Sequence, residues 1–364
     1  MQFTVSKSAL TSALALVGRV VGKASSVPIL SNVKLAADAD GLMVTGTDLE
    51  IALSVRVEAK VTEPGTATLP AKKMSEYSRL LADGDVKVKV DEKTWWATIT
   101  SGRSRTRVAG MSPEAFPEVP AVPGSTLQVP VAALLKIINR AKMAITTVES
   151  RFTLNGAKFE YRGGNLYLIA TDGQRLAMAS VELPGDAAEV KFILPLGAIR
   201  NLPQITGVSE FLKISQDDNH LFFRAGSALL VVRKITGNFP DYQRVLPKES
   251  KIVATLNRME LSAALSRVAQ FADERSRSVK LTLKAGELEI SATSVEAGES
   301  TEEVACDYSG DGLEMGFNAQ YLLEFLAAVD SDAVELRLND AKAAGELRPA
   351  GAADYRYVVM PMRI

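Results

Sequence analysis

The chain has 364 residues, of which 47% are apolar and 23% charged, and its formal net charge at pH 7 is −1. These proportions are typical of a globular protein and exclude a disordered or collagen-like chain. The length exceeds what one ordinary hydrophobic core supports and predicts two or three domains. The near-zero charge excludes a strong long-range attraction to nucleic acid, so any contact with DNA must come from local clusters of charge.

The first expected element is a short strand that leads into an amphipathic helix. Residues 3–5 read Phe-Thr-Val, and Leu10, Leu14 and Val17 then follow at helical spacing. Lys7 followed by this apolar stretch resembles the charged and apolar regions of a signal peptide. The strand before it and the helical spacing within it favour a folded element instead. No run reaches the roughly 18 apolar residues that would span a bilayer. We therefore expect a cytoplasmic protein that makes no contact with a membrane.

The same strand-helix pattern returns twice, which indicates internal repeats. Three landmarks recur at intervals of roughly 120 residues. The first is the strand and helix at residues 3–17, 127–138 and 253–268. The second is a strand crossing that contains threonine, at residues 46–49, 170–173 and 292–295. The third is another strand-helix unit, at residues 69–81, 194–202 and 317–329.

Each repeat therefore contains two helices and several β-rich runs. The runs include residues 86–90, 95–100, 166–170, 212–214, 221–224, 281–283 and 334–338. Pro120, Pro123 and Gly124 mark the first junction between repeats, and residues 246–249 mark the second. We expect an α+β fold of three tandem modules, each with two helices on an antiparallel sheet. The modules should occupy residues 1–122, 123–249 and 250–364.

Patterns that support catalysis or metal binding are weak in this chain. Cys306 is the single cysteine and His220 the single histidine, so neither an intrachain disulfide nor a His/Cys metal cluster can form. Residues 18–24 resemble a phosphate loop, but three residues separate the glycines instead of four, and the magnesium-binding serine or threonine is missing. We interpret Cys306 and His220 as structural and expect no cofactor and no catalysis.

The acidic residues leave one enzymatic alternative open. Asp48, Glu50 and Asp172 could be imagined as the two-metal centre of a nuclease. They recur at matching positions of the repeats, however, which favours turns and strand ends. Asp217 and Asp218 lie between two β-rich runs, where short polar side chains favour a hairpin turn. A metal nuclease therefore stays as the competing enzyme hypothesis.

Basic residues gather on the predicted helices. Lys136 and Arg140 lie opposite the apolar stripe of their helix, and no acid accompanies them there. Lys72 and Lys73 bias a helix of the first module in the same way, and Arg200 stands alone on its counterpart. The pattern fits helices that face a polyanion and contact phosphates without reading sequence. The alternative is that these residues only form the solvated face of ordinary amphipathic helices.

The end of the chain carries the most specific motif. Residues 357–364 read Tyr-Val-Val-Met-Pro-Met-Arg-Ile, which closely resembles the C-terminus of the bacterial DNA polymerase III beta subunits, the DNA sliding clamps. Further matches to this family lie at residues 3–5, 28–30, 46–50, 101–105, 154–156, 170–176 and 239–242. The resemblance implies a head-to-tail homodimer whose six modules close into a ring, with helices lining the hole and sheets outside. It also implies a processivity factor for DNA polymerase that encircles duplex DNA without sequence specificity and catalyses nothing.

The resemblance further implies a hydrophobic peptide-binding pocket between the second and third modules. Its partners would be the replicative polymerase alpha subunit, the clamp loader, and repair and translesion polymerases. One part of the pocket should comprise Leu154, Thr171, Gly173, Gln174, Arg175, Leu176, Pro240, Arg244, Val245, Val358 and Met360. The adjoining part should involve Arg151, Tyr321, Pro361 and Met362. Flexible methionines beside a rigid proline suit a groove that accepts several peptides.

The residues expected to face DNA are Lys23, Lys72, Lys73, Lys136, Arg140 and Arg200. Three other positions depart from the family pattern. Gln174 stands where the best-known members have histidine, and Thr153 replaces an aromatic residue near the pocket. Thr106 occupies a place where an aromatic residue can occur at the dimer edge. Peptide preference and ring stability are therefore not carried over from the family, and a repeat scaffold that binds peptides but never DNA is the remaining alternative.

Overall fold

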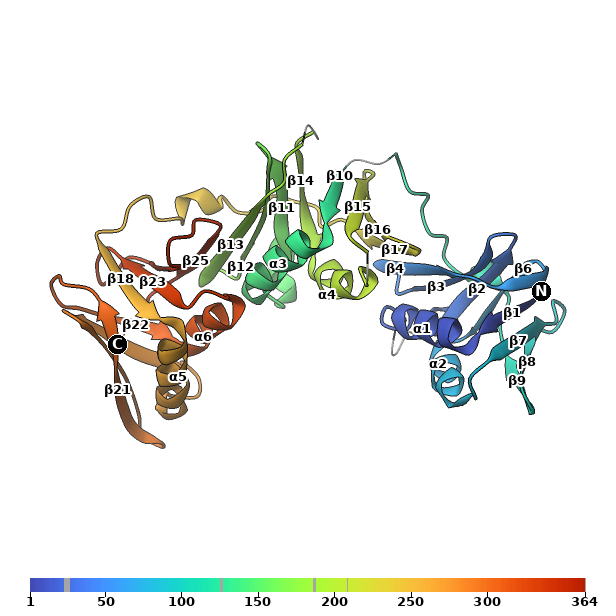
Figure 1. Cartoon of the computed structure of the whole chain (residues 1–364), viewed down its shortest axis with the longest axis horizontal. Helices are drawn as coiled ribbons and strands as arrows, with labels where there is room; N and C mark the ends of the chain where they lie inside the picture. The colour runs from blue at the N-terminus through green and yellow to red at the C-terminus, as the bar shows by residue number, and fades with distance from the viewer. Residues whose placement is uncertain (23–26, 125–126, 186–187, 208, 364) are drawn as a thin grey trace. The chain divides into compact units, whose positions relative to one another are not determined.

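The computed structural model describes residues 1–22, 27–124, 127–185, 188–207 and 209–363. The chain divides into two compact units, each formed by two separate stretches of sequence. The first unit contains Met1–Ala132 and Gly197–Lys234, and the second contains Ala133–Leu196 and Ile235–Ile364. Figure 1 shows the course of the chain and labels its helices and, where there is room, its strands.

The first unit contains a five-stranded and an eight-stranded sheet. In spatial order the five-stranded sheet holds β5 (Lys60–Glu63), β1 (Gln2–Ser6), β7 (Asp85–Val90), β8 (Trp96–Ser101) and β9 (Ser104–Ala109). The eight-stranded sheet holds β10 (Leu127–Pro130), β15 (Phe211–Gln216), β16 (His220–Ala225), β17 (Ala228–Arg233), β4 (Ile51–Val57), β3 (Gly41–Thr47), β2 (Asn32–Asp38) and β6 (Gly65–Pro70). The β4–β17 pair joins a strand of the first predicted module to a strand of the second.

The second unit is built on a twelve-stranded sheet. In spatial order it holds β14 (Val190–Pro195), β11 (Gly156–Arg162), β12 (Asn165–Thr171), β13 (Arg175–Glu182), β25 (Tyr355–Val359), β24 (Gly345–Pro349), β23 (Ala333–Leu338), β18 (Ile252–Asn257), β21 (Gly298–Asp307), β20 (Glu287–Ser294), β19 (Ser278–Lys284) and β22 (Leu313–Asn318). The β13–β25 pair joins the second predicted module to the third.

The helices are short, and polar side chains cap several of them. They are α1 (Lys7–Val17), α2 (Ala71–Leu80), α3 (Val131–Ala141), α4 (Leu196–Ile205), α5 (Arg258–Val268) and α6 (Ala319–Ala328). The 3-10 segments are η1 (Pro28–Ser31), η2 (Pro113–Ala115), η3 (Lys142–Ala144), η4 (Glu149–Leu154), η5 (Tyr242–Arg244) and η6 (Ala269–Phe271). Ser6 caps α1 by accepting a hydrogen bond from the backbone N–H of Ala9, and Asn257 caps α5 by accepting from Met259 and Glu260. Such caps satisfy N–H groups that have no partner inside the helix.

The helix α1 shows how the spacing of apolar residues becomes core. Leu10, Leu14 and Val17 are buried, and α1 packs on β3 and β4 beside α2 (Figure 1). At Gly46 of β3, an added Cβ would come within 2.6 Å of the Val17 side chain. Glycine at this position therefore allows the helix to approach the strand closely. The N-terminal apolar stretch belongs to the fold, and across the described ranges every helix is too short or too polar to cross a membrane.

The strand registers repeat between the first and second modules. Lys34 on β2 faces Thr45 on β3, and Lys158 on β11 faces Ile169 on β12 at positions 124 residues later. The expectation of tandem two-helix, antiparallel-sheet modules is therefore confirmed. The boundaries near residues 122 and 250 stay a prediction, because the compact units follow the continuous sheets and divide the middle module.

Candidate functional site

The turn between β12 and β13 is held in shape by its own side chains. Thr171 Oγ1 donates to the carbonyl of Arg175 at 2.6 Å and accepts from the N–H of Gly173 at 3.1 Å. Asp172 Oδ1 accepts from the N–H groups of Gln174 and Arg175 at 2.9 and 3.0 Å. Gly173 has a φ of 89°, a left-handed conformation that favours glycine. The interpretation of Asp172 as a turn residue is confirmed, and the turn holds Gln174 in a fixed place.

The C-terminal strand runs beside this turn. On β13 and β25, Arg175 pairs with Val359, and Leu176 pairs with Val358. Beyond β25, the N–H of Met360 donates to the carbonyl of Gln174 at 2.8 Å. The N–H of Met362 then donates to Gly316 on β22, also at 2.8 Å. The tail at residues 360–362 is thus fixed at both ends, and it crosses from the turn to β22.

A small apolar cluster lies under the turn and the tail. Leu176 and Val358, both expected in the pocket, are buried there with Ile169 and Tyr242. Leu176 is 2% exposed and Val358 is 1% exposed, so both form the floor of a site. A ligand would contact mainly the residues around this floor. Tyr242 was not expected in this cluster.

Apolar side chains around this floor are exposed. Val245 is 43% exposed and Met360 is 46% exposed. Phe152 on η4 is 55% exposed and lies between the expected Arg151 and Thr153 in sequence. Large apolar side chains at these exposures are suited to contact with a ligand. We call the surface formed by residues 151–154, 171–176, 240–245 and 358–362 the tail groove.

Other expected residues lie at the edges of the tail groove. Pro240 and Arg244 are exposed, and Arg244 forms an ion pair with Asp241 at 2.9 Å. Leu154 is half-buried at the end of η4. Arg151 donates a hydrogen bond to the carbonyl of Asp172 and so links η4 to the turn.

Arg175 lies at the centre of a buried network. Its guanidinium donates to Asp172 Oδ2 at 3.0 Å, to the hydroxyl of Tyr357 at 3.1 Å and to Glu324. It also lies 4.1 Å from the centre of the Tyr321 ring, a cation–π contact. Burial opposes the charge, but Tyr357 and Glu324 outweigh it, so the pKa of Arg175 lies above its ordinary value. Arg175 therefore supports the tail groove from beneath.

The second part of the expected pocket lies beside α6. A cavity of about 330 Å³ is lined by Gln174, Arg275, Ser276, Asn318, Tyr321, Met360, Pro361 and Met362. The hydroxyl of Tyr321 donates to Gln174 Oε1 at 2.7 Å, which connects α6 to the turn. Arg275, Ser276 and Asn318 were not expected here. No motif singles them out in the sequence, because they belong to a loop and a helix cap elsewhere in the third module.

The basic residues expected to face DNA fall into two groups. Lys72 and Lys73 on α2 and Arg200 on α4 are exposed, as the sequence pattern predicts. Lys136 pairs with Asp354 at 3.0 Å, and Arg140 pairs with the same carboxylate at 2.9 Å. Lys23 lies outside the described residues.

The expectation that Arg140 faces solvent is wrong. Its exposure is 7%, and its guanidinium lies 5.2 Å from the centre of the Tyr355 ring. Burial alone would raise the pKa of the Asp354 carboxyl, but hydrogen bonds from Lys136 and Arg140 hold that pKa below its ordinary value. The acid that neutralises this helix comes from the far end of the sequence, so counting charges along the helix could not reveal it.

The remaining chemical candidates serve the structure. Asp48 Oδ1 accepts from the N–H groups of Glu50 and Ile51 at 3.0 and 2.7 Å, so this carboxylate also shapes a turn. Asp217 accepts from the N–H of His220 at 2.6 Å between β15 and β16, which confirms the predicted hairpin turn. Thr106 lies on β9, where its hydroxyl accepts from Tyr77 at 2.8 Å.

Comparisons with known proteins cover the whole chain. The family models that match are the N-terminal domain of the DNA polymerase III beta subunit at residues 1–120, its central domain at residues 128–241, and its C-terminal domain at residues 243–363. The Beta sliding clamp of Pseudomonas putida is 36% identical over 100% of both chains.

Solved structures agree with the family models. A sliding clamp of Pseudomonas aeruginosa bound to griselimycin has a TM-score of 0.95 at 34% identity and covers 100% of both chains. The DNA polymerase sliding clamp of Bacillus subtilis has a TM-score of 0.96 at 25% identity and covers 100% of this chain and 99% of that one. The chain therefore belongs to the DNA polymerase III beta subunit family, the DNA sliding clamps.

Proposed function

We propose that two copies of this chain close head to tail into a ring around duplex DNA, and that each copy holds partner proteins at the tail groove. Family membership makes the chain a processivity factor for DNA polymerase, as its sequence predicts. One observation supports the binding proposal most directly. Residues 360–362 lie beside the turn at residues 171–175, over a buried apolar floor. The partners would be the polymerase alpha subunit, the clamp loader, and repair and translesion polymerases, through short hydrophobic peptides.

The exposed side chains of the tail groove support a hydrophobic ligand. Phe152, Val245 and Met360 are exposed on segments that adjoin the buried floor made by Leu176 and Val358. A peptide that buries one leucine or phenylalanine there gains about 1.5–3 kcal/mol for each side chain. Two such anchors offset part of the entropic cost of association. The resulting affinity is modest, which suits reversible exchange of several partners. Methionine adapts its shape to different side chains, so Met360 and Met362 favour the same conclusion.

The hydrogen bond between Tyr321 and Gln174 lies between the tail groove and the cavity beside α6. Both residues also line the cavity beside Pro361 and Met362. A peptide that reaches from the Leu176 floor to this cavity has to cross or replace the bond. Gln174 stands where the best-known relatives have histidine, so this crossing point is where we expect the chain to differ from them in peptide preference.

The contact with DNA in this proposal is weak and electrostatic. Lys72, Lys73 and Arg200 are exposed on helices and can approach phosphates without reading bases. A closed ring is held on DNA by its topology, so tight contacts are unnecessary. Enclosure also requires no bond-making step, which is why we propose a non-catalytic subunit. The strand β9, which carries Thr106, lies at the edge of its sheet and offers backbone groups to a second copy.

Fluorescence anisotropy with a labelled peptide tests the tail groove. The probe is the hydrophobic C-terminal peptide of the replicative polymerase alpha subunit from the same organism. We expect Met360→Ala and Val245→Ala each to weaken binding by roughly tenfold, which corresponds to about 1.4 kcal/mol. Met259→Ala is the matched control, because Met259 is 61% exposed on α5 and lies outside the groove. Equal losses in Met259→Ala and Met360→Ala would refute the groove as the binding site.

The salt dependence of loading onto DNA tests the exposed lysines. Replacing Lys72 and Lys73 with alanine should reduce the slope of log affinity against log salt by roughly 0.9 for each phosphate that these lysines neutralise. Lys136→Ala is the control and should reduce it less, because Lys136 already pairs with Asp354. An unchanged slope in the double variant would remove these lysines from the DNA interface. Function that needs no DNA would favour the scaffold alternative, and magnesium-dependent cleavage that disappears on substitution of Asp48 would favour the nuclease.

A further inference from the structure

The first junction between modules is formed in the same way as the second, by an antiparallel pair of strands from neighbouring modules. On β4 and β17, Ala52 faces Val231, while on β13 and β25 Leu176 faces Val358. The segments that leave the modules are also alike. Residues 116–119 read Phe-Pro-Glu-Val after the first module, and residues 239–242 read Phe-Pro-Asp-Tyr after the second. Val119 therefore occupies the position that Tyr242 occupies at the second junction.

At the second junction, Tyr242 packs in a buried cluster with Ile169, Leu176 and Val358. Its side chain is 3% exposed, and its hydroxyl donates to Glu160 Oε2 at 3.0 Å. Arg162 donates to the same hydroxyl at 3.3 Å, and Lys158 Nζ lies 5.0 Å from the centre of the ring. A cation over an aromatic face is attracted by the ring. This tyrosine is held by a cation above its ring and polar groups at its tip.

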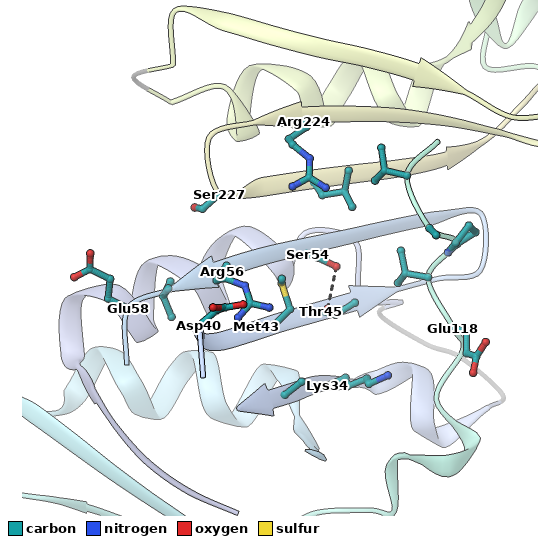
Figure 2. A pocket seen from close by; sticks show the side chains of 17 residues that line it. Lys34, Asp40, Met43, Thr45, Ser54, Arg56, Glu58, Glu118, Arg224 and Ser227 are labelled. Carbon is teal, nitrogen blue, oxygen red and sulfur yellow. Dashed lines mark hydrogen bonds between the residues drawn. The ribbon is translucent and has the colours of Figure 1, made fainter. Parts of the chain in front are cut away.

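At the first junction, the corresponding space is open. A cavity of about 830 Å³ is lined by residues 118–122, which include Val119, and by side chains of β2, β3, β4 and β17. Figure 2 shows the residues that line it. Lys34 lines it at the position equivalent to Lys158, as the matching registers of β2 and β11 show. Thr45 and Ser54 take the places of Ile169 and Met178, and they form a hydrogen bond with each other at 2.9 Å.

The walls of this cavity suit an aromatic side chain. Met43, Val119 and Leu229 supply apolar surface. Arg56, which pairs with Asp38 through two hydrogen bonds, lines the cavity and offers a guanidinium to an entering phenol hydroxyl. The polar partner at the tip therefore differs from the second junction, because Ala36 and Asp38 stand where Glu160 and Arg162 stand there. Figure 2 shows Arg56 on β4 with Met43 beside it. The volume lies within the usual range of ligand pockets, roughly 300–1,000 Å³.

We propose that this cavity binds an aromatic side chain, tyrosine foremost, presented by a segment of a partner protein. The repeat itself supplies the argument, because the same backbone site holds a tyrosine under a lysine where the chain provides one. Val119 is too short to fill the space, and the ring nearest to Lys34 is Phe116, whose centre lies 5.8 Å from Nζ. A ring at the position of Tyr242 therefore has to come from outside and would share Lys34 with Phe116. This site is separate from the tail groove, and the proposal stands independently of peptide binding there.

Methionine-methyl NMR of the full chain tests the proposal, because Met43 lines the cavity. The probe is a capped alanyl-tyrosyl-alanine tripeptide, and the control ligand is the same peptide with leucine. Met43→Leu identifies the resonance by removing it. We expect the Met43 resonance to shift saturably with the tyrosine peptide and not with the leucine peptide. No shift, or equal shifts with both peptides, overturns the proposal.

Two variants show whether the response of Met43 comes from this cavity. In Val119→Tyr the tethered ring should fill the cavity, so the Met43 resonance is displaced without ligand and no longer responds to the tyrosine peptide. Val253→Tyr is the matched control, because Val253 is 37% exposed on β18 and should leave the response unchanged. Lys34→Ala should weaken binding of the tyrosine peptide at least fivefold and serves if Val119→Tyr does not fold. A wild-type response in both Val119→Tyr and Lys34→Ala contradicts the site.

Discussion

The turns at residues 47–51 and 171–175 have nearly the same hydrogen bonds and different surroundings. In both, a threonine hydroxyl bonds the carbonyl four residues later, and an aspartate accepts two backbone N–H groups. The first turn meets the end of β17, where the N–H of Arg233 donates to Glu50. The second meets the end of β25, where the N–H of Met360 donates to Gln174. The backbone plan is repeated, and the difference in side chains places the tail groove at the second junction.

The charges at the two junctions differ in burial as well. Glu50 and Arg233 form an exposed pair 3.6 Å apart, with side chains 67% and 65% exposed. At the second junction, the Arg175 and Glu324 side chains that pair are 10% and 29% exposed. Buried pairs are costly to break on one side, whereas exposed pairs contribute little. Substitutions that exchange features between the junctions therefore test whether the comparison is correct.

The largest effect is expected for Arg175→Ile, which gives the second turn the residue that the first has at Ile51. The substitution leaves Asp172 and Glu324 without their cation in a mostly buried site. We expect the free energy of unfolding to fall by about 3 kcal/mol. Chemical denaturation measures it, and adding Glu324→Gln should restore part of the loss. If Arg175→Ile unfolds at the same denaturant concentration as the wild type, the network does not support the groove.

Next in size is Met360→Arg, which copies Arg233 onto the tail. A charge at the rim of the apolar groove should weaken binding of the labelled peptide by more than tenfold, which is more than about 1.4 kcal/mol. Thermal melting should change little, because Met360 is 46% exposed. The reverse change, Arg233→Met, should leave peptide affinity as it is. Unaltered affinity in Met360→Arg would contradict the assignment of the tail to peptide binding.

A smaller effect is expected at the third residue of each turn. Leu49 and Gly173 both have positive φ, at 81° and 89°. Gly173→Ala should destabilise the fold by about 1–2 kcal/mol, since a Cβ is strained in this conformation. Leu49→Gly should stabilise it by at most about 1 kcal/mol, because glycine also loses more entropy on folding. Opposite signs in thermal denaturation are the expected result, and equal signs would show that the turns are not equivalent.

The smallest effect is expected for Glu50→Gln at the first junction. The substitution removes one charge of an exposed pair, so the free energy of unfolding should change by less than about 0.5 kcal/mol. Denaturation at low and high salt measures the change. A loss comparable to that of Arg175→Ile would mean that the two junctions are stabilised in the same way.

Much of this architecture could be predicted from the sequence. The strand and helix at residues 3–17 follow from local spacing, and the structure places β1 and α1 there. The turn residues Asp48, Asp172 and Asp217 follow from the preference of short polar side chains for turns. The meeting of residues 171–176 with the tail was expected from the family resemblance, because β13 and β25 are far apart in the sequence.

Other features depend on distant residues that no local pattern connects. Arg140 was expected to face solvent, but it is buried, and it pairs with Asp354 and lies over the Tyr355 ring, both from the C-terminal module. Phe152 could have been noticed, because it is an apolar residue next to Arg151, which the family resemblance places in the pocket. The open cavity at the first junction could not be predicted from local patterns, since its walls come from β2, β3, β4, β17 and residues 118–122.

Retention on DNA of different topology tests the central claim most directly. The clamp is loaded onto a closed circular plasmid, half of the sample is linearised with a restriction enzyme, and the protein remaining on each form is followed with time. We predict persistent retention on the circle and rapid loss from the linear form, because a ring can slide off a free end. Equal rates of dissociation from the two forms would contradict enclosure of DNA by this chain.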